Sequence, residues 1–299
     1  MKPSVSVAAR SSFNTVVRRV VVLADGEKPE VRPRVAEVMD FLAERELETH
    51  LDEDVRRFCD ACEAKPPVLS IGRPDLVVVL GGDGSVLTAV RAFGRDPIPV
   101  LGINYGRVGF LAPVEACAWK EGLLDAIEGR AMQEMRMRVD VEMTGGRRLM
   151  ALNDAVLTRS PDAGMISIAL SADGDRVGLY RADGLILATP SGSTAYSLAA
   201  GGPILAPTMA GIVATPLSAH ALSLRPLVLS PEAELRMELI SGSGLLVVDG
   251  QPAGPLDVGD CVSVRRSAQP YPLLMPAGMD PWRRLEDRLG WSGSLPERN

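Results

Sequence analysis

A hydrophobic strand that leads into a glycine-rich turn, LVVVLGGDGS at residues 76–85, decides the fold of this chain. Leu76 to Leu80 form a continuous apolar run with three valines, which is typical of a strand buried on both faces of a parallel sheet. Gly81 and Gly82 end that strand, and Ser85 to Phe93 then read as a helix. A buried strand followed directly by a helix predicts part of an α/β domain.

The same alternation continues on either side of this stretch. Val20 to Leu23 form a second short strand, and apolar residues at i, i+3, i+4 and i+7 predict a helix after it (Val35, Val38, Met39 and Leu42). Ile98 to Ile103 predict a third strand, followed by a glycine-rich loop and a helix near Trp119 to Glu128. We therefore expect a parallel-sheet α/β nucleotide-binding domain, covered by helices on both faces, at residues 1–132.

The pattern changes after about Gly129, where short alternating segments and Gly-Gly or Asp-Gly turns begin. Many short strands with such turns predict an antiparallel β-sandwich or barrel-like domain, which we place at residues 133–275. The expected strands are 136–142, 149–157, 166–171, 177–180, 185–188, 227–229, 235–240, 245–248 and 262–265. A last helix is predicted with Asp280 as N-cap, Pro281 in its first turn, and Trp282, Leu285 and Leu289 on one face.

Composition narrows the class of protein. Of the 299 residues, 46% are hydrophobic and the formal net charge is -6, without a long basic block, which argues against a nucleic-acid or anionic-membrane surface. No apolar run reaches the roughly 18 residues that span a bilayer. The stretch Met1 to Val17 lacks the apolar core of a secretory signal, so we expect a cytoplasmic protein that binds no membrane.

Cys59 and Cys62 form a C-x-x-C pair in a stretch that reads as helical. A zinc site needs two further ligands, and the chain offers no second tight pair. Two thiols on one helix face are the better interpretation, and no residues are assigned to a metal.

The turn Gly81-Gly82-Asp83-Gly84-Ser85 is the sharpest candidate for chemistry. It lies at the carboxyl end of a buried parallel strand, where ligands of open α/β sheets bind, and its backbone amides suit a phosphate. Asp83 would repel that phosphate unless it binds a cation or accepts a proton from a hydroxyl, and both roles occur in phosphoryl transfer. The alternative is a simple strand-to-helix turn that Asp83 caps. The chain has neither a G-x-x-x-x-G-K-[ST] loop nor a complete G-x-G-x-x-G fingerprint.

Two further segments carry polar residues suited to a nucleoside. TPSGSTAY at residues 189–196 follows a strand and offers small hydroxyl side chains and an aromatic ring, although it also fits a serine-rich N-cap. Asn153 and Asp154 stand together in an apolar stretch. Neighbours on a strand point to opposite faces unless a bulge or a strand end turns both inward, so the pair indicates a ligand or a break in the strand.

Together these motifs resemble the NAD kinase family. The resemblance runs in order from about residue 20 to residue 291 and is carried by GGDG at 81–84, GINYGRVGFL at 102–111, LND at 152–154, DGL at 183–185, TPSGSTAYSLAAGGPI at 189–204, LRP at 224–226 and DGQ at 249–251. It implies an N-terminal α/β domain and a C-terminal all-β domain, with NAD in the cleft and the last helix, 276–299, packing back on the first domain.

The resemblance also assigns the site. It implies that Asp83 accepts the proton of the adenosine ribose 2′-hydroxyl and that Asn153 and Asp154 hold adenosine. The glycine turn forms the phosphate loop (Gly81, Gly82, Gly84 and Ser85). The other residues it places at NAD are Gly84, Phe110, Arg181, Asp183, Ser191, Thr194, Ala195, Tyr196, Ser197, Ala199 and Gln251.

By this resemblance the protein transfers a phosphoryl group from ATP or polyphosphate to NAD, with a divalent cation, Mg²⁺, and it is a dimer or tetramer. Three positions depart from the family: Asp154 replaces a common glutamate, Ala199 a common serine, and Pro281 stands where relatives tend to have aromatics. Two other functions stay open from the residues alone. A lipid or sugar-phosphate kinase would share the glycine turn, and a non-catalytic dinucleotide sensor would not need the Asp83 carboxylate.

Overall fold

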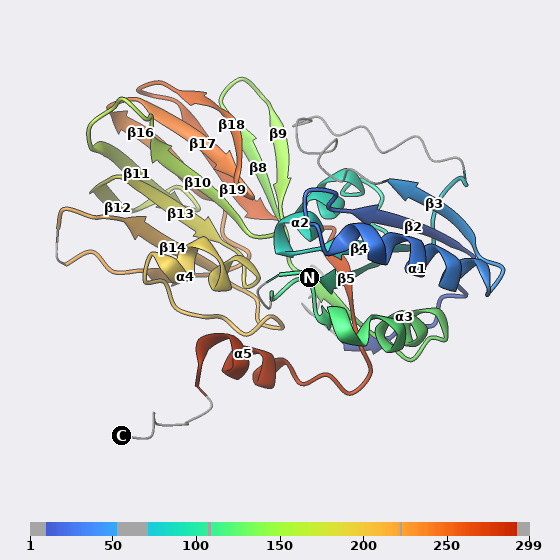
Figure 1. The fold of residues 1–299 in the computed structure, drawn as a ribbon. Helices are drawn as coiled ribbons and strands as arrows, with labels where there is room; N and C mark the ends of the chain where they lie inside the picture. The colour runs from blue at the N-terminus through green and yellow to red at the C-terminus, as the bar shows by residue number, and fades with distance from the viewer. Residues whose placement is uncertain (1–9, 53–70, 107–108, 222, 292–299) are drawn as a thin grey trace, which may run out of the picture. The chain divides into compact units, whose positions relative to one another are not determined.

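A computed structural model of the protein describes residues 10–52, 71–106, 109–221 and 223–291 (Figure 1). Within these ranges the chain forms two compact units. Residues 10–52, 71–134 and 272–291 make up the first, here called the α/β unit, and residues 135–271 make up the second, the β unit. No helix in the described ranges is long and apolar enough to cross a membrane. Cys59 and Cys62 lie outside the described residues.

The α/β unit is built on one eight-stranded sheet. Its strands are β1 (Arg10–Ser12), β2 (Arg19–Ala24), β3 (Glu48–Asp52), β4 (Leu76–Gly81), β5 (Val100–Asn104), β6 (Val114–Glu115), β7 (Met132–Arg136) and β20 (Tyr271–Met275). Their order is β1-β7-β20-β5-β4-β2-β3, with β6 paired to β5. The central strands β2, β4 and β5 are parallel, whereas β1 and β7 pair antiparallel. The three predicted strands are therefore confirmed, in a mixed sheet.

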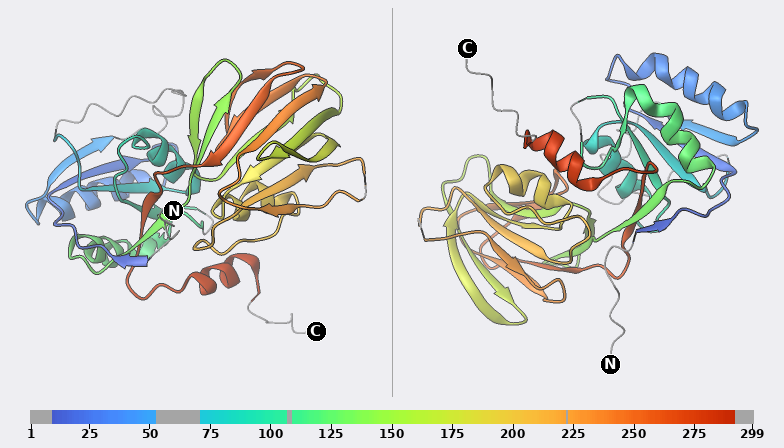
Figure 2. Two further views of the ribbon diagram at one scale, coloured as in Figure 1. Left: turned by 180° about the vertical axis from the view of Figure 1, so that it is seen from behind. Right: turned by 90° about the horizontal axis from the view of Figure 1, so that it is seen from below.

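Helices cover both faces of this sheet. Helices α1 (Val31–Ala43) and α3 (Trp119–Ile127) share one face, where the Phe41 and Trp119 rings meet edge to face with centroids 5.3 Å apart (Figure 2). Leu101 and Ile103 of β5 belong to the same core. Gly102 lies between them on the strand and points the other way, where a Cβ atom would lie 2.9 Å from Val86 in helix α2 (Asp83–Ala92). Helix α2 thus packs on the opposite face.

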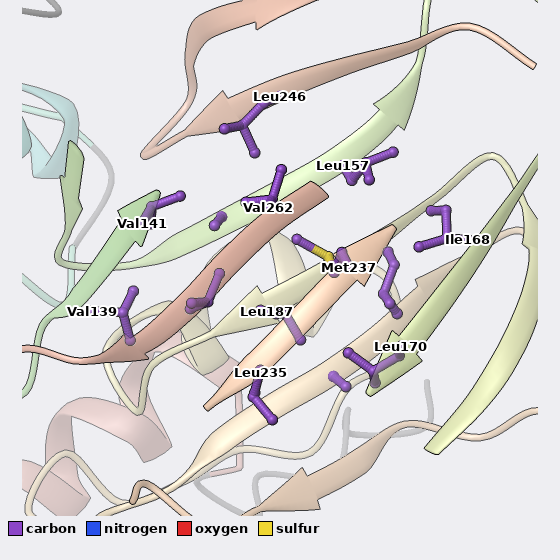
Figure 3. Close-up of a cluster of buried hydrophobic side chains, with 14 of the residues drawn as sticks. Val139, Val141, Leu157, Ile168, Leu170, Leu187, Leu235, Met237, Leu246 and Val262 are labelled. Atoms are coloured by element: carbon purple, nitrogen blue, oxygen red, sulfur yellow. The ribbon is translucent and has the colours of Figure 1, made fainter. Parts of the chain in front are cut away.

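The β unit is a sandwich of two six-stranded antiparallel sheets. The first has the order β15-β14-β13-β10-β17-β18 and the second β12-β11-β16-β19-β8-β9. Leu157, Leu187 and Leu246 of the first sheet and Val141, Ile168 and Met237 of the second lie in one buried core between the sheets (Figure 3). The strands are β8 (Val139–Met143), β9 (Arg148–Ala151), β10 (Asp154–Arg159), β11 (Ile166–Ala172), β12 (Asp175–Ala182), β13 (Gly184–Ala188), β14 (Ile212–Leu217), β15 (Leu227–Leu229), β16 (Leu235–Ser241), β17 (Gly244–Val248), β18 (Gln251–Leu256) and β19 (Cys261–Arg266).

The strand predicted at 136–142 is confirmed as β8, which begins at Val139, while Arg136 is the last residue of β7 in the α/β sheet. Another predicted strand of this unit is wrong, because it is really two strands. The stretch 149–157 divides at Leu152 and Asn153 into β9, in one sheet of the sandwich, and β10, in the other. Continuous apolar alternation does not reveal such a break, because both halves keep a buried face.

The C-terminal segment returns to the α/β unit. Strand β20 pairs in parallel with β5, so Pro272 to Met275 belong to the α/β unit rather than to the β domain expected at 133–275. Helix α5 (Pro281–Leu289) begins at Asp280, whose Oδ1 accepts the Trp282 N–H at 2.9 Å, as predicted. Leu285 is buried, whereas Trp282 is 63% exposed, so burial is uneven along the predicted face. Arg284 is also buried and donates to the Phe110 carbonyl oxygen at 2.9 Å.

Candidate functional site

Asp83 is the first residue of helix α2 and stands at the carboxyl end of strand β4. Its carboxylate accepts three consecutive backbone N–H groups: Phe110 at 2.8 Å on Oδ2, and Leu111 at 3.0 Å and Ala112 at 3.1 Å on Oδ1. An ionised carboxylate offers about four lone-pair positions. Three are used by the segment after β5, so capacity is left for one more donor, such as a sugar hydroxyl.

Two glycines allow this segment to reach Asp83. A Cβ atom on Gly109 would collide with Asp83 Oδ1, and one on Gly102 would lie 2.7 Å from the Ala112 Cα atom. Real Cβ atoms do not approach that closely, so the contact requires glycine at both positions. The glycines of the GINYGRVGFL motif at 102–111 therefore allow the backbone amides of residues 110–112 to contact the Asp83 carboxylate.

The predicted phosphate-loop residues divide into two groups. Gly82 is the N-cap of α2, and Gly84 faces open space, so both present their backbone outward. Gly81 and Ser85 are buried and serve the turn itself, since Gly81 packs against the Ser85 side chain. The Ser85 hydroxyl donates to Asp25 Oδ2 at 3.2 Å and lies 3.4 Å from the Gly82 N–H, which donates to it. Asp25, at the end of β2, is a buried acid that the sequence analysis missed.

A second aspartate in the β unit makes the same kind of contact. Asp249 follows strand β17, and its carboxylate accepts the backbone N–H groups of Leu152 at 2.8 Å, Asn153 at 2.7 Å and Asp154 at 3.1 Å. Strands β17 and β10 are neighbours, with Val248 opposite Ala155, which places Asp249 beside the start of β10. Asp249 fixes the chain where it crosses from β9 to β10, and only its place in the DGQ motif pointed to it beforehand.

Asn153 and Asp154 are both buried at this crossing. Among the described residues, Asn153 Oδ1 has no hydrogen-bond partner, although a buried amide oxygen normally has one. Burial, and then the nearby Asp249 charge, raise the pKa of Asp154 from 3.8 to about 7. The pair thus combines an amide oxygen without a hydrogen bond to a described residue and a carboxyl group whose pKa lies close to neutral pH. Such a buried pair is more typical of a binding site than of a packed core.

The segment 189–194 packs directly on this pair. Thr189 follows β13, which neighbours β10, and its hydroxyl donates to the Leu152 carbonyl oxygen at 2.5 Å. The Thr189 N–H donates to the Asn153 carbonyl oxygen at 2.8 Å. A Cβ atom on Gly192 would collide with the same carbonyl group, so glycine is needed for this approach. Three neighbouring strands thus bring Asn153, Asp154 and this segment to one end of the sheet.

The remaining predicted residues of the segment differ in exposure. Ser191 and Thr194 are buried, with the Thr194 hydroxyl donating to the Ser191 carbonyl oxygen at 2.9 Å. Ser197 is fully buried, and its hydroxyl lies 2.8 Å from that of Thr215. The Tyr196 ring is 51% exposed, Ala199 is exposed and Ala195 is half-buried. Tyr196 is thus the ring of this group that is open to a ligand.

Arg181 and Asp183 lie apart from the Asn153 group. Asp183 precedes β13 and Thr189 follows it, so the two residues are roughly 20 Å apart at about 3.4 Å per residue. Asp183 forms an ion pair with Arg159 at 3.1 Å, and Arg181 is exposed on β12. In contrast, Gln251 pairs with Val248 at the start of β18, close to Asp249.

Phe110 belongs to the Asp83 group. Besides its N–H contact with Asp83, its ring lies under the Arg288 guanidinium of α5, 4.7 Å from the ring centroid. No group of three or more His, Cys, Asp or Glu side chains suited to a metal ion occurs within the described part of the chain.

Comparison with known proteins gives a consistent result. Residues 20–131 match the model of the ATP-NAD kinase N-terminal domain and residues 152–275 that of the ATP-NAD kinase C-terminal domain. The chain is 42% identical to an NAD kinase of Rhodopirellula baltica over 236 residues, 75% of this chain and 74% of that protein. It is 35% identical to an NAD kinase of Methylibium petroleiphilum over 292 residues, 94% and 97% of the two chains.

Solved structures agree with these relatives. Yeast NADH kinase, crystallised with NADH, superposes with a TM-score of 0.84 at 27% identity, covering 98% of this chain and 95% of the yeast chain. An NAD kinase from Archaeoglobus fulgidus in complex with ATP superposes with a TM-score of 0.75 at 25% identity, covering 92% and 100%. Sequence, fold and site together show that the chain belongs to the NAD kinase family.

Proposed function

We propose that this protein transfers the terminal phosphoryl group of ATP to the adenosine ribose 2′-hydroxyl of NAD, which gives NADP and ADP. The hydroxyl oxygen attacks the γ-phosphorus in line, and the bond from that phosphorus to the bridging oxygen of ADP breaks. Asp83 accepts the hydroxyl proton as the new bond forms. Positioning and charge neutralisation supply most of the rate in such a transfer.

The observation that carries this proposal is the state of the Asp83 carboxylate. Three amides fix its orientation, and the remaining lone pair is the one available to a substrate hydroxyl. It also stands at the first turn of α2, where backbone N–H groups favour an anion such as a phosphate. A proton acceptor and an anion site at one turn are the two requirements of a kinase that acts on an alcohol.

The β unit supplies groups suited to adenosine. Asn153 Oδ1, which has no partner in the described part of the chain, can accept from an adenine amino group, and Asp154 can pair with a ribose hydroxyl. The exposed ring of Tyr196 offers a flat apolar surface to the base. These features favour a dinucleotide over the acyl chain or sugar phosphate of other kinases that carry a similar glycine turn.

The donor and the cation belong to the same proposal. The relative from Archaeoglobus fulgidus was crystallised with ATP, which supports ATP over polyphosphate here. Mg²⁺ is usually held by one or two carboxylates together with nucleotide phosphates, and Asp25 is a second carboxylate beside the glycine turn. Such an ion neutralises charge on the phosphates. Because the yeast relative is named for NADH, the acceptor panel should contain NADH beside NAD.

The decisive experiment combines a donor-by-acceptor panel with Asp83→Asn. Wild-type protein should form 2′-phosphorylated product from NAD, ATP and Mg²⁺, detected by mass spectrometry. Asp83→Asn should lower kcat by about 100-fold or more, the usual scale for a general base, and bind NAD within about tenfold of wild type. Asparagine keeps one acceptor oxygen, but its amide group faces an N–H, so the melting temperature must be measured alongside.

Asp175→Asn is the matched control, because Asp175 is an exposed acid on β12 and should leave kcat unchanged. Near-normal NADP formation by Asp83→Asn would reject the base assignment. If wild-type protein binds NAD but forms no product with any donor, the dinucleotide-sensor alternative replaces the kinase.

We also propose that the protein forms a homo-oligomer. Among the described strands, β15 ends its sheet and pairs with β14 alone. Its residues Leu227 and Val228 are 40% and 49% exposed, and an open apolar edge of this kind is commonly covered by another chain. Light scattering of the purified protein distinguishes a monomer from a dimer or tetramer.

A further inference from the structure

The side chain of Lys28 lies where three loops of the α/β unit meet. These loops follow β2, β4 and β5, which are adjacent parallel strands, so all three leave the carboxyl edge of the sheet. Backbone hydrogen bonds hold the loops together: the Asp25 N–H donates to the Leu80 carbonyl oxygen, and the Tyr105 N–H donates to the Gly81 carbonyl oxygen. The Lys28 ammonium group donates to the carbonyl oxygen of Tyr105 at 2.5 Å. Its charge therefore lies at the loop after β5, although Lys28 itself belongs to the loop after β2.

Two glycines border this ammonium group. A Cβ atom on Gly82 would lie 3.3 Å from Lys28 Nζ, and one on Gly106 would lie 3.1 Å from it. Both distances are tighter than ordinary contacts, so any larger residue would crowd the charge. Glycine at 82 and 106 keeps the backbone beside the ammonium group accessible, and Gly82 is also the N-cap of α2. A cation and two residues without side chains therefore lie together beside the start of α2.

The positive charge of Lys28 is not neutralised by an ion pair with any described residue. Among the described residues, no carboxylate lies within the 4.0 Å that defines a salt bridge to its nitrogen, although the chain carries a net charge of -6. An ammonium group has three donors, and the contact with Tyr105 uses one. A half-buried lysine with spare donors at an anion-favouring turn is suited to bind a ligand oxygen.

We propose that Lys28 contacts the phosphate chain of the phosphoryl donor and selects donors that carry a triphosphate or longer chain. This inference rests on the proposed kinase function. Lys28 shares the glycine turn with Asp83, which accepts the proton of the acceptor hydroxyl, so the anion nearest that turn is the phosphate chain being cleaved. Its charge-assisted bonds to phosphate oxygens add to those of the α2 amides.

A purely structural role for Lys28 makes different predictions. If the side chain serves only to tie Tyr105 in place, Lys28→Gln should behave like wild type, because glutamine retains an N–H donor for that carbonyl. If Lys28 binds phosphate, Lys28→Gln should lose donor affinity, and Lys28→Arg should recover most of it because the charge is kept.

The experiment measures steady-state kinetics and direct binding on the full-length protein. Lys28→Gln should raise KM for ATP between tenfold and a hundredfold, leave KM for NAD within twofold, and weaken inhibition by tripolyphosphate in parallel. Lys120→Gln is the matched control, because Lys120 is an exposed lysine on α3. It should change neither KM.

The proposal is overturned if Lys28→Gln leaves KM for ATP within twofold, or if KM for NAD rises as much as KM for ATP. It is also overturned if Lys28→Arg is as impaired as Lys28→Gln. Failure of the kinase function itself looks different, because wild-type protein would then form no NADP. Calorimetric titration of wild type and Lys28→Gln with tripolyphosphate would still decide whether Lys28 binds a phosphate chain.

Discussion

Asp83 in the α/β unit and Asp249 in the β unit make the same contact, and their differences show how one device serves two purposes. Each carboxylate accepts three consecutive backbone amides from a segment distant in sequence. Asp83 is half-buried at the first turn of a helix, and its own carboxylate is the group that we propose to contact the substrate. Asp249 is buried at a hairpin, with φ of 47°, and holds two other polar residues in place.

The comparison teaches that three amides on a carboxylate do not by themselves reveal a role. At Asp83 the amides orient the carboxylate that we propose as the proton acceptor. At Asp249 they orient Asn153 and Asp154, and the Asp249 charge contributes to the raised pKa of Asp154. Substitutions that separate orienting from reacting therefore test the comparison directly.

Gly109→Ala should produce the largest effect. Its new methyl group would displace the Asp83 carboxylate or the segment after β5, because a Cβ atom at this position collides with Asp83 Oδ1. We expect kcat to fall by about 100-fold or more, as for loss of a general base, although no charge is removed. Gly164→Ala is the control, since Gly164 is exposed in the β unit and a Cβ atom there meets nothing within 4 Å. Equal rates for Gly109→Ala and wild type would contradict the orienting role of the amides.

Asp249→Asn should have an intermediate effect and a different kinetic signature. Asparagine can keep the contacts of Oδ1 with Asn153 and Asp154, but it presents an amide N–H to the buried N–H of Leu152. We expect a loss of about 1–3 kcal/mol in the free energy of unfolding, the cost of one unsatisfied buried donor. KM for NAD should rise by roughly tenfold with kcat nearly unchanged, because misplacing Asn153 and Asp154 should cost about 1.4 kcal/mol of binding free energy, which corresponds to a factor of ten. If kcat falls and KM does not, Asp249 acts in the chemistry and the comparison fails.

Asp154→Asn should show its effect in the dependence of stability on pH. Because the folded-state pKa is raised to about 7 from 3.8, the folded protein retains a proton that the unfolded chain releases between these values. The free energy of unfolding of wild type should therefore fall as pH rises from about 4 to 7 and level off above. Asparagine mimics the protonated acid, so the variant should gain on wild type by a few kcal/mol above pH 7 and little at pH 4.

Denaturation by urea at pH 5 and pH 8 measures this difference. The exposed Asp175 is again the matched control, and Asp175→Asn should show no pH-dependent gain. A gain for Asp154→Asn that is the same at both pH values would mean that burial does not suppress the ionisation of Asp154.

The sequence predicted the fold best where pattern and punctuation agree. Valine-rich runs located the parallel strands, and Asp-Gly turns located hairpins such as β11–β12. Strands β14, β18 and β20 were missed because each contains proline, at Pro216, Pro252 and Pro255, and Pro272, and proline argues against a strand. Long-range pairing with neighbours outweighs that local preference.

The candidate site was predicted in its polar residues but not in its supports. Asp83 and the Asn153–Asp154 pair stand out because polar residues interrupt apolar runs. Lys28 and Asp249 look like ordinary turn residues, since their partners come from segments 77 and about 95 positions away. Only folding brings Lys28 to Gly82 and Asp249 to Leu152, so no local pattern encodes either contact.

The crossing of the chain from β9 to β10 has a consequence for how mutations spread through this protein. Asn153 and Asp154 lie where the chain passes from one sheet of the sandwich to the other. A displacement of one sheet relative to the other would therefore move both residues. Core substitutions at Met237 or Leu246, which lie between the two layers, are therefore expected to change the affinity for the proposed dinucleotide. Variation in the core residues between the two sheets is then one way for relatives with the same polar residues to differ in substrate preference.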